Sequence, residues 1–450
     1  MKRALYRAVV MGSGGDGREA RYEGKRKPFH KWICDRSPLD VLMYITYLIL
    51  HDNKINKIGK VAMDAVTNPY APGAGSQPPE LAGRDELIQK TKTTLARVKM
   101  GRQAKSFMLV GLRGVGKTVL LNKIQEIAEK SGYVAILLES PEGKSLPELL
   151  IPCLRKILFK LDTKEMVNES VKRGMMVLRS FISTVKVNWE GFDIGVDPEV
   201  GSADSGDLEA DLPDLVEAIG VAAKSRQSSV AIIIDELQYV PEVEFSALIM
   251  AMHRVAQKQL PIVLIAAGLP QLVGLAGRSK SYAERLFDYP KIDKLSYEDA
   301  ATALLEPARR EGVSFEQSAV DSVIRLTQGY PYFLQEWGYH AWNIAQNSPI
   351  TKADVEQASA TALKNLDESF FRVRFDRLTP REKDYLFAMA ALGPGPHRSG
   401  DVASELGVFV ESIAPVRSSL IKKGMIFSPA HGDTAFTVPL FDEYLKRVHP

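Results

Sequence analysis

The chain has 450 residues, more than one hydrophobic core usually holds, which indicates roughly two to four domains. Hydrophobic residues make up 45% and charged residues 25%, the balance of a soluble globular protein. Its two cysteines, Cys34 and Cys153, lack metal-ligand spacing, which argues against a disulfide framework or a zinc site. Because no apolar run approaches about 20 residues and no signal-peptide pattern begins the chain, we expect a cytoplasmic protein without a membrane partner.

Charge is distributed unevenly along the chain. Residues 1–62 contain 13 Lys and Arg against 6 Asp and Glu, whereas the remaining residues contain 45 against 49. The body of the protein is therefore not strongly basic, and a nucleic-acid surface would have to be a local patch. Residues 11–31 are rich in glycine and charge. We interpret residues 1–62 as a disordered extension or a mis-assigned upstream start, with a genuine basic arm as the alternative.

After this extension the predicted elements alternate between strands and helices. Residues 69–79 form a Pro/Gly/Ser linker, and helical periodicity begins at Asp85. Short buried strands are predicted at 107–110, 133–139, 230–234 and 261–267, with helical patterns between them. This alternation predicts an α/β fold with a parallel sheet that helices cover on both faces. An insertion at about 162–211 includes a predicted hairpin (186–197) and an acidic loop (201–211).

Residues 111–118, GLRGVGKT, match the phosphate-binding pattern GxxxxGK[ST], with a strand before the loop and a helix after it. Glycines let the backbone fold around phosphates, and the amides and helix N-terminus supply partial positive charge. We expect Lys117 to reach the β- and γ-phosphates and the Thr118 hydroxyl to bind Mg²⁺. The predicted cofactor-binding residues of the loop are Gly111, Leu112, Arg113, Gly114, Val115, Gly116, Lys117 and Thr118.

A second motif, which is acidic, follows 117 residues after Thr118, where the buried strand of VAIIIDEL ends. In parallel sheets of this kind, ligands bind at the carboxyl ends of the strands. We expect Asp235 to hold Mg²⁺ through water and Glu236 to orient or deprotonate the attacking water. The two motifs together predict ATP and Mg²⁺ as cofactors.

The chain from Leu81 to Pro450 resembles AAA-type ATPases of the origin-recognition-like group, and its order of parts is similar to STAND signalling NTPases. Residues 81–87, LAGRDEL, are similar to the box that borders adenine in these families, which implies that Arg84 lines the nucleotide site. Residues 265–270, IAAGLP, resemble the strand-four end that carries sensor 1. The family usually has a polar residue there, and the Ala and Gly of this chain argue against strong γ-phosphate sensing.

Two further sites are implied by the same resemblance. Arg285 stands in SYAERL where such families place an arginine finger, acting in cis or in trans; Arg278 competes with it, and a solvated surface arginine is the alternative. A finger acting in trans leaves a homo-oligomer open. Gly329-Tyr330-Pro331 resembles the GxP motif of the STAND helical lid and implies that Pro331 packs near the base. The alternative is a simple turn that starts the next helix.

The C-terminal residues 379–450 predict three helices followed by a two-stranded hairpin, a winged helix-turn-helix. Its third helix offers Arg417, Lys422 and Lys423 to DNA, and Arg372, Arg374 and Arg377 could supplement them. This module contains eight basic and eight acidic residues, so it has no electrostatic surplus. In STAND proteins the equivalent module folds back on the nucleotide. Contact with double-stranded DNA and a structural or switching role therefore both stay open.

The sequence as a whole predicts an ATP-binding AAA-type ATPase in which Mg²⁺-dependent hydrolysis switches a lid and a winged helix, in association with DNA. The alternative is a STAND-like nucleotide switch that acts on protein partners without DNA. A metabolic P-loop kinase is disfavoured because nothing resembles a small-substrate lid. Turnover is expected to be slow or partner-dependent. The predicted parts are the extension (1–62), a linker (63–80), the P-loop ATPase domain (81–295), an all-α lid (296–368) and the winged helix domain (379–450).

Overall fold

The computed structural model describes residues 63–73, 75, 78–162, 168–185 and 196–449. They belong to one compact unit. The predicted extension and most of the predicted hairpin at 186–197 lie outside the described residues.

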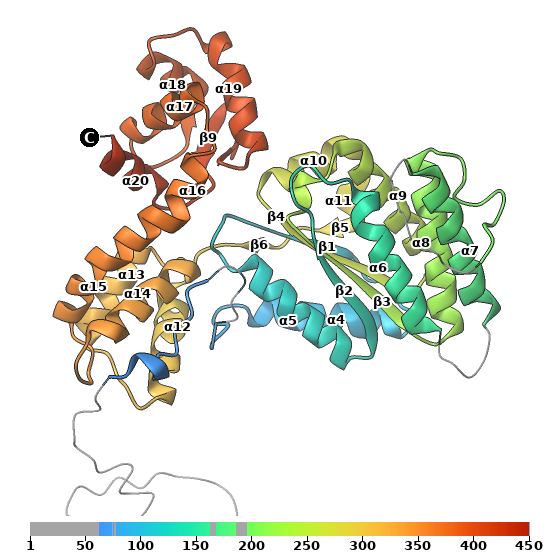
Figure 1. The fold of residues 1–450 in the computed structure, drawn as a ribbon, viewed down its shortest axis with the longest axis horizontal. Coiled ribbons are helices and arrows are strands. Elements are labelled where there is room, and N and C mark those ends of the chain that lie inside the picture. The colour runs from blue at the N-terminus through green and yellow to red at the C-terminus, as the bar shows by residue number, and fades with distance from the viewer. Residues whose placement is uncertain (1–62, 74, 76–77, 163–167, 186–195, 450) are drawn as a thin grey trace, which may run out of the picture. The chain divides into compact units, whose positions relative to one another are not determined.

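A parallel sheet forms the centre of the fold (Figure 1). The carboxyl ends of its strands meet at one edge, where Glu139 lies opposite Asp235 and Val110 lies opposite Gly268. Three of its long strands, 106–111, 229–235 and 262–268, are buried at every residue, as continuous apolar runs in a covered sheet require, and the strand 133–139 is buried in part. The strand order is β2 (Tyr133–Glu139), β3 (Ser229–Asp235), β4 (Ile262–Gly268), β1 (Ser106–Gly111) and β5 (Phe287–Asp288), with β6 (Lys291–Ile292) also paired to β1.

Helices cover both faces of this sheet, which confirms the predicted α/β architecture (Figure 1). One face packs against α4 (Asp85–Lys99) and α5 (Lys117–Lys130). The other face packs against α6 (Leu146–Leu161), α8 (Leu208–Ser225) and α9 (Glu242–Gln257), with α7 (Glu169–Thr184) outside α8.

The start of α8 corrects the prediction of an acidic loop at 201–211. The helix begins at Leu208 because the Asp207 side chain accepts a hydrogen bond from the Glu209 amide and caps it. Asp211, inside this first turn, is buried and accepts hydrogen bonds from Ser205 and the Gly206 amide. Acidic composition here therefore reflects helix capping and turn closure rather than a solvated loop.

The segment expected to be a free linker is instead packed on helices. At one end Tyr70 is 2% exposed, and its hydroxyl donates a hydrogen bond to the Leu304 carbonyl. At the other end Arg310 donates to the Pro79 carbonyl at 3.0 Å and forms an ion pair with Glu80. We call residues 70–73, 75 and 78–80 the strap, because both of its ends are held on the same helical bundle.

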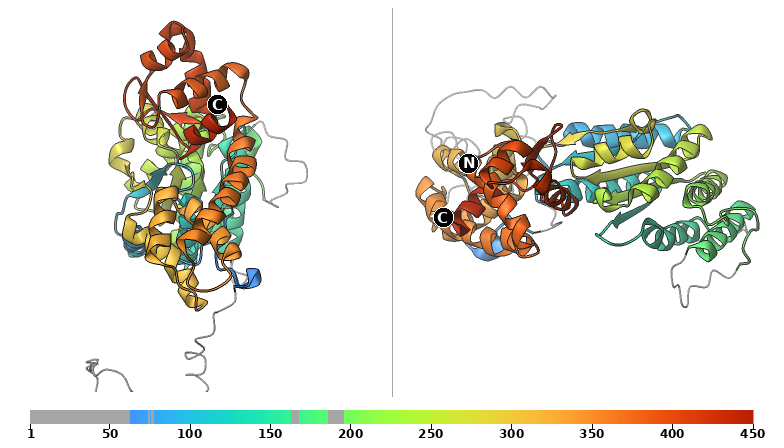
Figure 2. Two further views of the ribbon diagram at one scale, coloured as in Figure 1. Left: turned by 90° about the vertical axis from the view of Figure 1, so that its left-hand side faces the viewer. Right: turned by 90° about the horizontal axis from the view of Figure 1, so that it is seen from above.

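That bundle consists of α12 (Tyr297–Arg310), α13 (Gln317–Thr327), α14 (Pro331–Ile344) and α15 (Lys352–Asn365), which pack against one another (Figure 2). The chain stays helical after α15 through a π-helical turn, Leu366–Phe371, into α16 (Arg372–Phe375). Phe370 and Phe371 of this turn contact Phe333 of α14, and Phe371 stacks on Tyr444 near the C-terminus. Aromatic packing thus joins the bundle to the C-terminal residues.

Residues 379–449, which we call the C-terminal module, contain a small antiparallel sheet in the order β7-β9-β8. The two-residue strands β5, β6 and β7 and the helix α20 were missing from the sequence prediction. Strands of two residues are too short to show a periodicity of two. The elements are α17 (Pro380–Ala391), β7 (His397–Arg398), α18 (Ser399–Glu405), α19 (Val410–Lys422), β8 (Ile426–Phe427), β9 (Asp433–Phe436) and α20 (Phe441–Val448).

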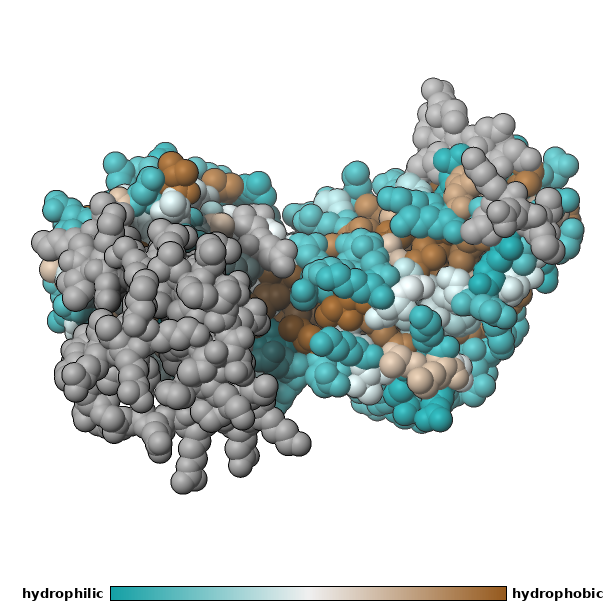
Figure 3. Space-filling view, turned by 90° about the horizontal axis from the view of Figure 1, so that it is seen from below, coloured by the Kyte–Doolittle hydropathy of each residue, from teal (hydrophilic) through white to brown (hydrophobic). Residues whose placement is uncertain are grey.

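The surface is mixed in character. On the face seen in Figure 3, hydrophilic residues surround smaller hydrophobic areas. Within the part of the chain that the structure describes, no helix combines the length and the apolar character that crossing a membrane requires.

Candidate functional site

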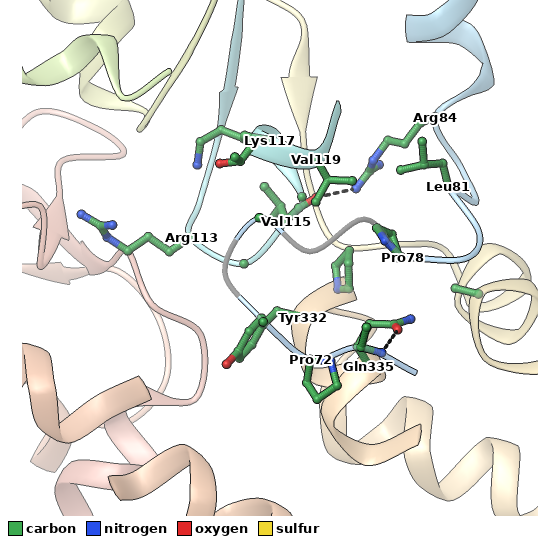
Figure 4. A pocket seen from close by; sticks show the side chains of 18 of the residues that line it. Pro72, Pro78, Leu81, Arg84, Arg113, Val115, Lys117, Val119, Tyr332 and Gln335 are labelled. Atoms are coloured by element: carbon green, nitrogen blue, oxygen red, sulfur yellow. Dashed lines mark hydrogen bonds between the residues drawn. The ribbon is translucent and has the colours of Figure 1, made fainter. Parts of the chain in front are cut away.

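A cavity of about 480 Å³ lies at the carboxyl edge of the sheet, a size typical of small-molecule sites. Its wall is formed by the glycine loop, the ends of β2 and β3, the strap and the bundle helix α14 (Figure 4). The cavity brings together most of the site residues that the sequence predicted. These are Arg84, Arg113, Gly114, Val115, Gly116, Lys117, Thr118, Asp235, Glu236 and Pro331.

The glycine loop holds Lys117 at the bottom of the cavity. Gly116 caps α5 with φ 89°, a left-handed conformation that glycine adopts without steric cost. Lys117 is 6% exposed, and its ammonium donates to the carbonyls of Gly111 at 3.0 Å and Leu112 at 2.9 Å. Burial lowers the pKa of Lys117, and the nearby carboxylates of Glu236 and Asp235 act in the opposite direction. The carbonyls of Gly111 and Leu112 thus orient the Lys117 side chain.

The two predicted metal ligands lie against each other. The Thr118 hydroxyl donates to Asp235 Oδ2 at 2.5 Å, although the two residues are 117 positions apart. Burial raises the pKa of Asp235, which is 4% exposed, while the hydrogen bond from Thr118 lowers it. A hydroxyl and a carboxylate are oxygen donors of the kind that Mg²⁺ prefers, and Mg²⁺ commonly takes one or two protein ligands plus phosphate and water.

The chemistry of this pair therefore fits a magnesium ion that a bound triphosphate would share. No group of three or more His, Cys, Asp or Glu residues with metal-binding geometry occurs among the described residues.

Arg84 supports the loop from the side of α4. Its guanidinium donates to the Val115 carbonyl at 3.1 Å and to the Asp293 carbonyl at 2.8 Å (Figure 4). Burial lowers the pKa of Arg84, and the negative charges of Asp299 and Asp293 oppose this shift. Arg84 therefore ties the glycine loop to the segment after β6 while also lining the cavity.

The bundle contributes residues that the sequence did not single out. The Tyr332 amide donates to the Gly114 carbonyl at 3.2 Å, one residue after Pro331, so α14 begins directly on the glycine loop. Gln335, one turn further, accepts a hydrogen bond from the Ala71 amide of the strap at 3.3 Å (Figure 4). The strap and α14 thus form one side of the cavity together.

Positive charge also lines the cavity. The Arg374 guanidinium lies 4.2 Å from the ring centre of Phe370. Burial lowers the pKa of Arg374 to about 10, and the positive charge of Arg113 acts in the same direction. With Lys117 and Arg84, these two arginines place four cations in the cavity lining, together with the four carboxylates of Glu80, Glu139, Asp235 and Glu236. The cavity therefore offers groups both for an anionic ligand and for a cation bound with it. The sequence had offered Arg374 only as a supplement to a DNA-binding surface.

Arg113 also links the loop to the C-terminal module. Its amide donates to the Thr437 carbonyl at 3.1 Å, and its guanidinium donates to the Tyr239 hydroxyl at 2.6 Å and the Gly424 carbonyl at 3.5 Å. Tyr239 follows the acidic motif at the end of β3. The two sequence motifs and the C-terminal module therefore meet at this arginine.

The structure does not bring the expected arginine finger into this cavity. Arg285 lines a second cavity, of about 420 Å³, together with Arg97 and Arg102 and the first residue of β1. The first residue of β1 lies at the end of the strand opposite the glycine loop. Arg278, its competitor, lies 3.6 Å from Glu242. A role in cis is therefore not supported for Arg285, because it belongs to the other edge of the sheet.

Two of the three residues expected to contact DNA are used inside the C-terminal module. Arg417 donates to Thr434 and Ser428, both at 2.9 Å, and to the Asp433 carbonyl at 2.8 Å. Lys423 forms a 2.8 Å ion pair with the buried carboxylate of Glu382. These bonds fix the hairpin and α17, so both side chains have partners within the module, and contact of either residue with DNA stays a prediction. Lys422, on the same helix, is exposed.

Comparison with known proteins assigns part of this chain. Residues 80–265 match the family of AAA ATPase domains, and residues 368–445 match a domain family of unknown function, DUF8462. A search of curated proteins finds no match.

Several solved structures are similar over most of their length. A Walker-type ATPase of Pyrococcus abyssi has 15% identity and a TM-score of 0.48, covering 81% of this chain and 96% of that one. The RuvB Holliday junction branch migration motor of Thermotoga maritima has 15% identity and a TM-score of 0.43, covering 83% and 99%. The Aeropyrum pernix ORC1 protein in complex with DNA has 15% identity and a TM-score of 0.41, covering 82% and 94%.

The matched range 80–265 contains the glycine loop, the acidic motif, the strands β1, β2 and β3 and the first part of β4. The strap residues before Glu80 and the bundle residues that line the cavity lie outside the matched range. Residues 80–265 are therefore similar to AAA ATPase domains, and the sheet and glycine loop they contain have the fold of a P-loop ATPase.

Proposed function

We propose that the protein binds ATP with Mg²⁺ in the 480 Å³ cavity, hydrolyses it, and uses the nucleotide to control the C-terminal module. The supporting observation is that the glycine loop contacts both the bundle and the module. Gly114 accepts the amide of Tyr332 in α14, and the Arg113 amide donates to Thr437 of the module. A loop that rearranges around phosphates would therefore alter contacts to two other parts of the chain at once.

The chain's own residues divide the chemistry among them. The amides from Gly114 to Thr118 and the ammonium of Lys117 would bind the phosphates, and Arg113 and Arg374 would add positive charge. Thr118 and Asp235 would hold Mg²⁺, which neutralises phosphate charge when bound. Glu236 would accept a proton from water as the water oxygen bonds to the terminal phosphorus and the bridging O–P bond breaks, leaving its electron pair on ADP.

Control of the module follows from differential binding. ATP can shift the equilibrium between two arrangements only if it binds one of them more tightly. The γ-phosphate supplies such a difference, because it would compete with the module for the guanidinium of Arg113. The ATP-bound form is therefore expected to loosen the contact of the Arg113 guanidinium with Gly424, and the ADP-bound form to keep it.

Amide hydrogen exchange tests this switch. With Mg²⁺ and a non-hydrolysable ATP analogue, peptides covering residues 424–437 should exchange roughly tenfold faster than with ADP, equivalent to about 1.4 kcal/mol of lost protection. Lys117→Ala is the control, because it should remove the nucleotide dependence without touching the module. Identical exchange of these peptides under all nucleotide conditions would contradict the switch.

The second candidate is association with double-stranded DNA through a winged helix. It is favoured by the order of elements in the C-terminal module, three helices followed by the β8-β9 hairpin, and by the exposed Lys422 at the end of α19.

Adding a generic DNA duplex to the hydrogen-exchange experiment separates the two candidates. DNA binding predicts that α19 is protected from exchange and that this protection falls steeply as the salt concentration rises. Lys422→Glu should reduce the slope of log affinity for DNA against log salt concentration by about one. Lys446→Glu on α20 is the matched control; an unprotected α19 removes DNA from the proposal.

A further inference from the structure

Gln238 connects the acidic motif to the end of the neighbouring strand. It lies in the short 3₁₀ turn Leu237–Tyr239 that follows β3. Its side-chain amide nitrogen donates to Glu236 Oε2, and its carbonyl oxygen accepts the Leu269 amide at 3.0 Å. Only a side chain with both a donor and an acceptor can make these two bonds at once, and glutamine has both.

The end of β4 leaves room for this side chain. Ala267 and Gly268 bring no polar group to the strand end. A Cβ atom on Gly268 would lie 2.7 Å from the Gln238 carbonyl oxygen and 2.9 Å from a methyl group of Leu272. Any larger residue at 268 would therefore displace Gln238. The side chain of Gln238 therefore occupies space that the absence of a side chain at Gly268 leaves open.

Glu236 is held by its neighbours in an unusual conformation. Its backbone has φ 54° and ψ 35°, the left-handed region that residues other than glycine rarely adopt. The Glu236 amide donates to Asp235 Oδ1 at 2.8 Å, which secures the backbone. Gln238 is the partner that secures the carboxylate. Glu236 lines the cavity, so the orientation of this carboxylate decides what it can reach there.

We propose that Gln238 is a positioning residue that holds the Glu236 carboxylate ready to receive the proton of the attacking water. This inference rests on the proposed ATP hydrolysis. Gln238 touches neither phosphate nor metal in this account and acts through Glu236 alone. Its bond to the Leu269 amide anchors it to β4, so the carboxylate is fixed relative to the sheet and not only to its own turn.

Steady-state ATP hydrolysis by the full chain tests the proposal. Gln238→Leu removes both bonds, and Gln238→Glu keeps the shape and the acceptor for Leu269 but cannot donate to Glu236. Both variants should lower kcat at least about tenfold and leave KM and ATP affinity within about twofold, because the lost contact matters only for the chemical step. Gln257→Leu, at an exposed position at the end of α9, is the matched control and should keep the wild-type kcat.

A second variant separates positioning from a merely structural effect. Gly268→Ala should reproduce the loss in kcat, because its methyl group occupies the place of the Gln238 carbonyl. The double variant Gly268→Ala, Gln238→Leu should be no slower than either single variant, since all three remove the same contact. Additive losses, a raised KM with unchanged kcat, or a Gln238→Glu variant as fast as the wild type would each overturn the proposal.

The hydrolysis rates of the wild type and of Lys117→Ala show whether the proposed function or only the role of Gln238 is wrong. If the wild type and Lys117→Ala hydrolyse ATP equally slowly, the hydrolysis itself is refuted and the role of Gln238 falls with it. If the wild type is active and Lys117→Ala is not, the proposed function holds. In that case an unchanged kcat in Gln238→Leu rejects the positioning role alone.

Discussion

Lys117→Ala should weaken ATP binding by about a hundredfold or more, the loss expected when roughly 3 kcal/mol of charge-assisted hydrogen bonding is removed. Lys117 is 6% exposed and lines the cavity where the phosphates would bind. Its ammonium is held there by hydrogen bonds to the carbonyls of Gly111 and Leu112. Burial lowers its pKa, and a bound triphosphate would stabilise the charged form. Calorimetric titration of Mg²⁺-ATP into both proteins measures the difference.

Lys130→Ala is the matched control for this experiment. Lys130 is the last residue of the same helix, α5, and forms a surface ion pair with Glu126. Such exposed pairs contribute little to stability, so the fold should be unaffected. An ATP affinity of Lys117→Ala within threefold of the wild type, on the order of half a kcal/mol, would contradict the placement of the phosphates at this loop.

Glu236→Gln should retain ATP binding and lose hydrolysis, with kcat reduced by about 10²- to 10⁴-fold, the usual contribution of general-base catalysis. The amide has nearly the same shape as the carboxylate but cannot accept the proton of water. Because Glu236 lies beside Asp235 and not between it and Thr118, the pair expected to hold Mg²⁺ should be preserved. Phosphate release measured under saturating ATP, together with a binding titration, separates the two steps.

A comparison variant, Glu242→Gln, changes an exposed acid at the start of α9 and should hydrolyse ATP at the wild-type rate. Turnover by Glu236→Gln close to that of the wild type would remove Glu236 from its catalytic role. Loss of binding as well as hydrolysis would instead indicate that the carboxylate helps to form the nucleotide site itself.

The sequence was informative where a short pattern dictates both a local shape and a chemistry. The spacing of the glycines, Lys117 and Thr118 requires a strand, a tight loop and a helix, and β1 and α5 form there. An apolar run ending in Asp235 requires a buried strand with an acid at its carboxyl end, which is β3. The direct contact of Thr118 with Asp235 follows from these two facts and the rule that parallel strands end at one edge.

Residues brought in by tertiary packing could not be found in this way. A Pro/Gly-rich stretch has no periodicity, so nothing in its pattern predicted that Tyr70 is buried or that the strap lines the cavity. Arg374 lies more than 250 residues from the glycine loop and reaches the cavity only through the helical turn after α15. The sequence singled out residues 265–270 for their missing polar side chain, but Gln238 meets Gly268 only in the folded chain, so its role could not be predicted.

A cluster of basic residues in the sequence does not reveal which of them form bonds to distant parts of the chain. Arg417 and Lys423 stand on one helix with Lys422 and look like a basic face. In the structure, the first is bonded to β9 and the second to Glu382 of α17. Lys423 is also one cause of the lowered pKa of Glu382: burial would raise this pKa, but hydrogen bonds from Lys423, Thr379 and Ser419 bring it to about 2.

The central claim is that a triphosphate and its metal are bound between the glycine loop and the tip of β3. The most direct measurement is an experimental structure of the protein with Mg²⁺ and a non-hydrolysable ATP analogue. We expect the phosphates to lie on the amides from Gly114 to Thr118 with the metal at Thr118 and Asp235. An analogue bound elsewhere, with the Thr118 hydroxyl still donating to Asp235 and the loop cavity filled by protein, would contradict the account.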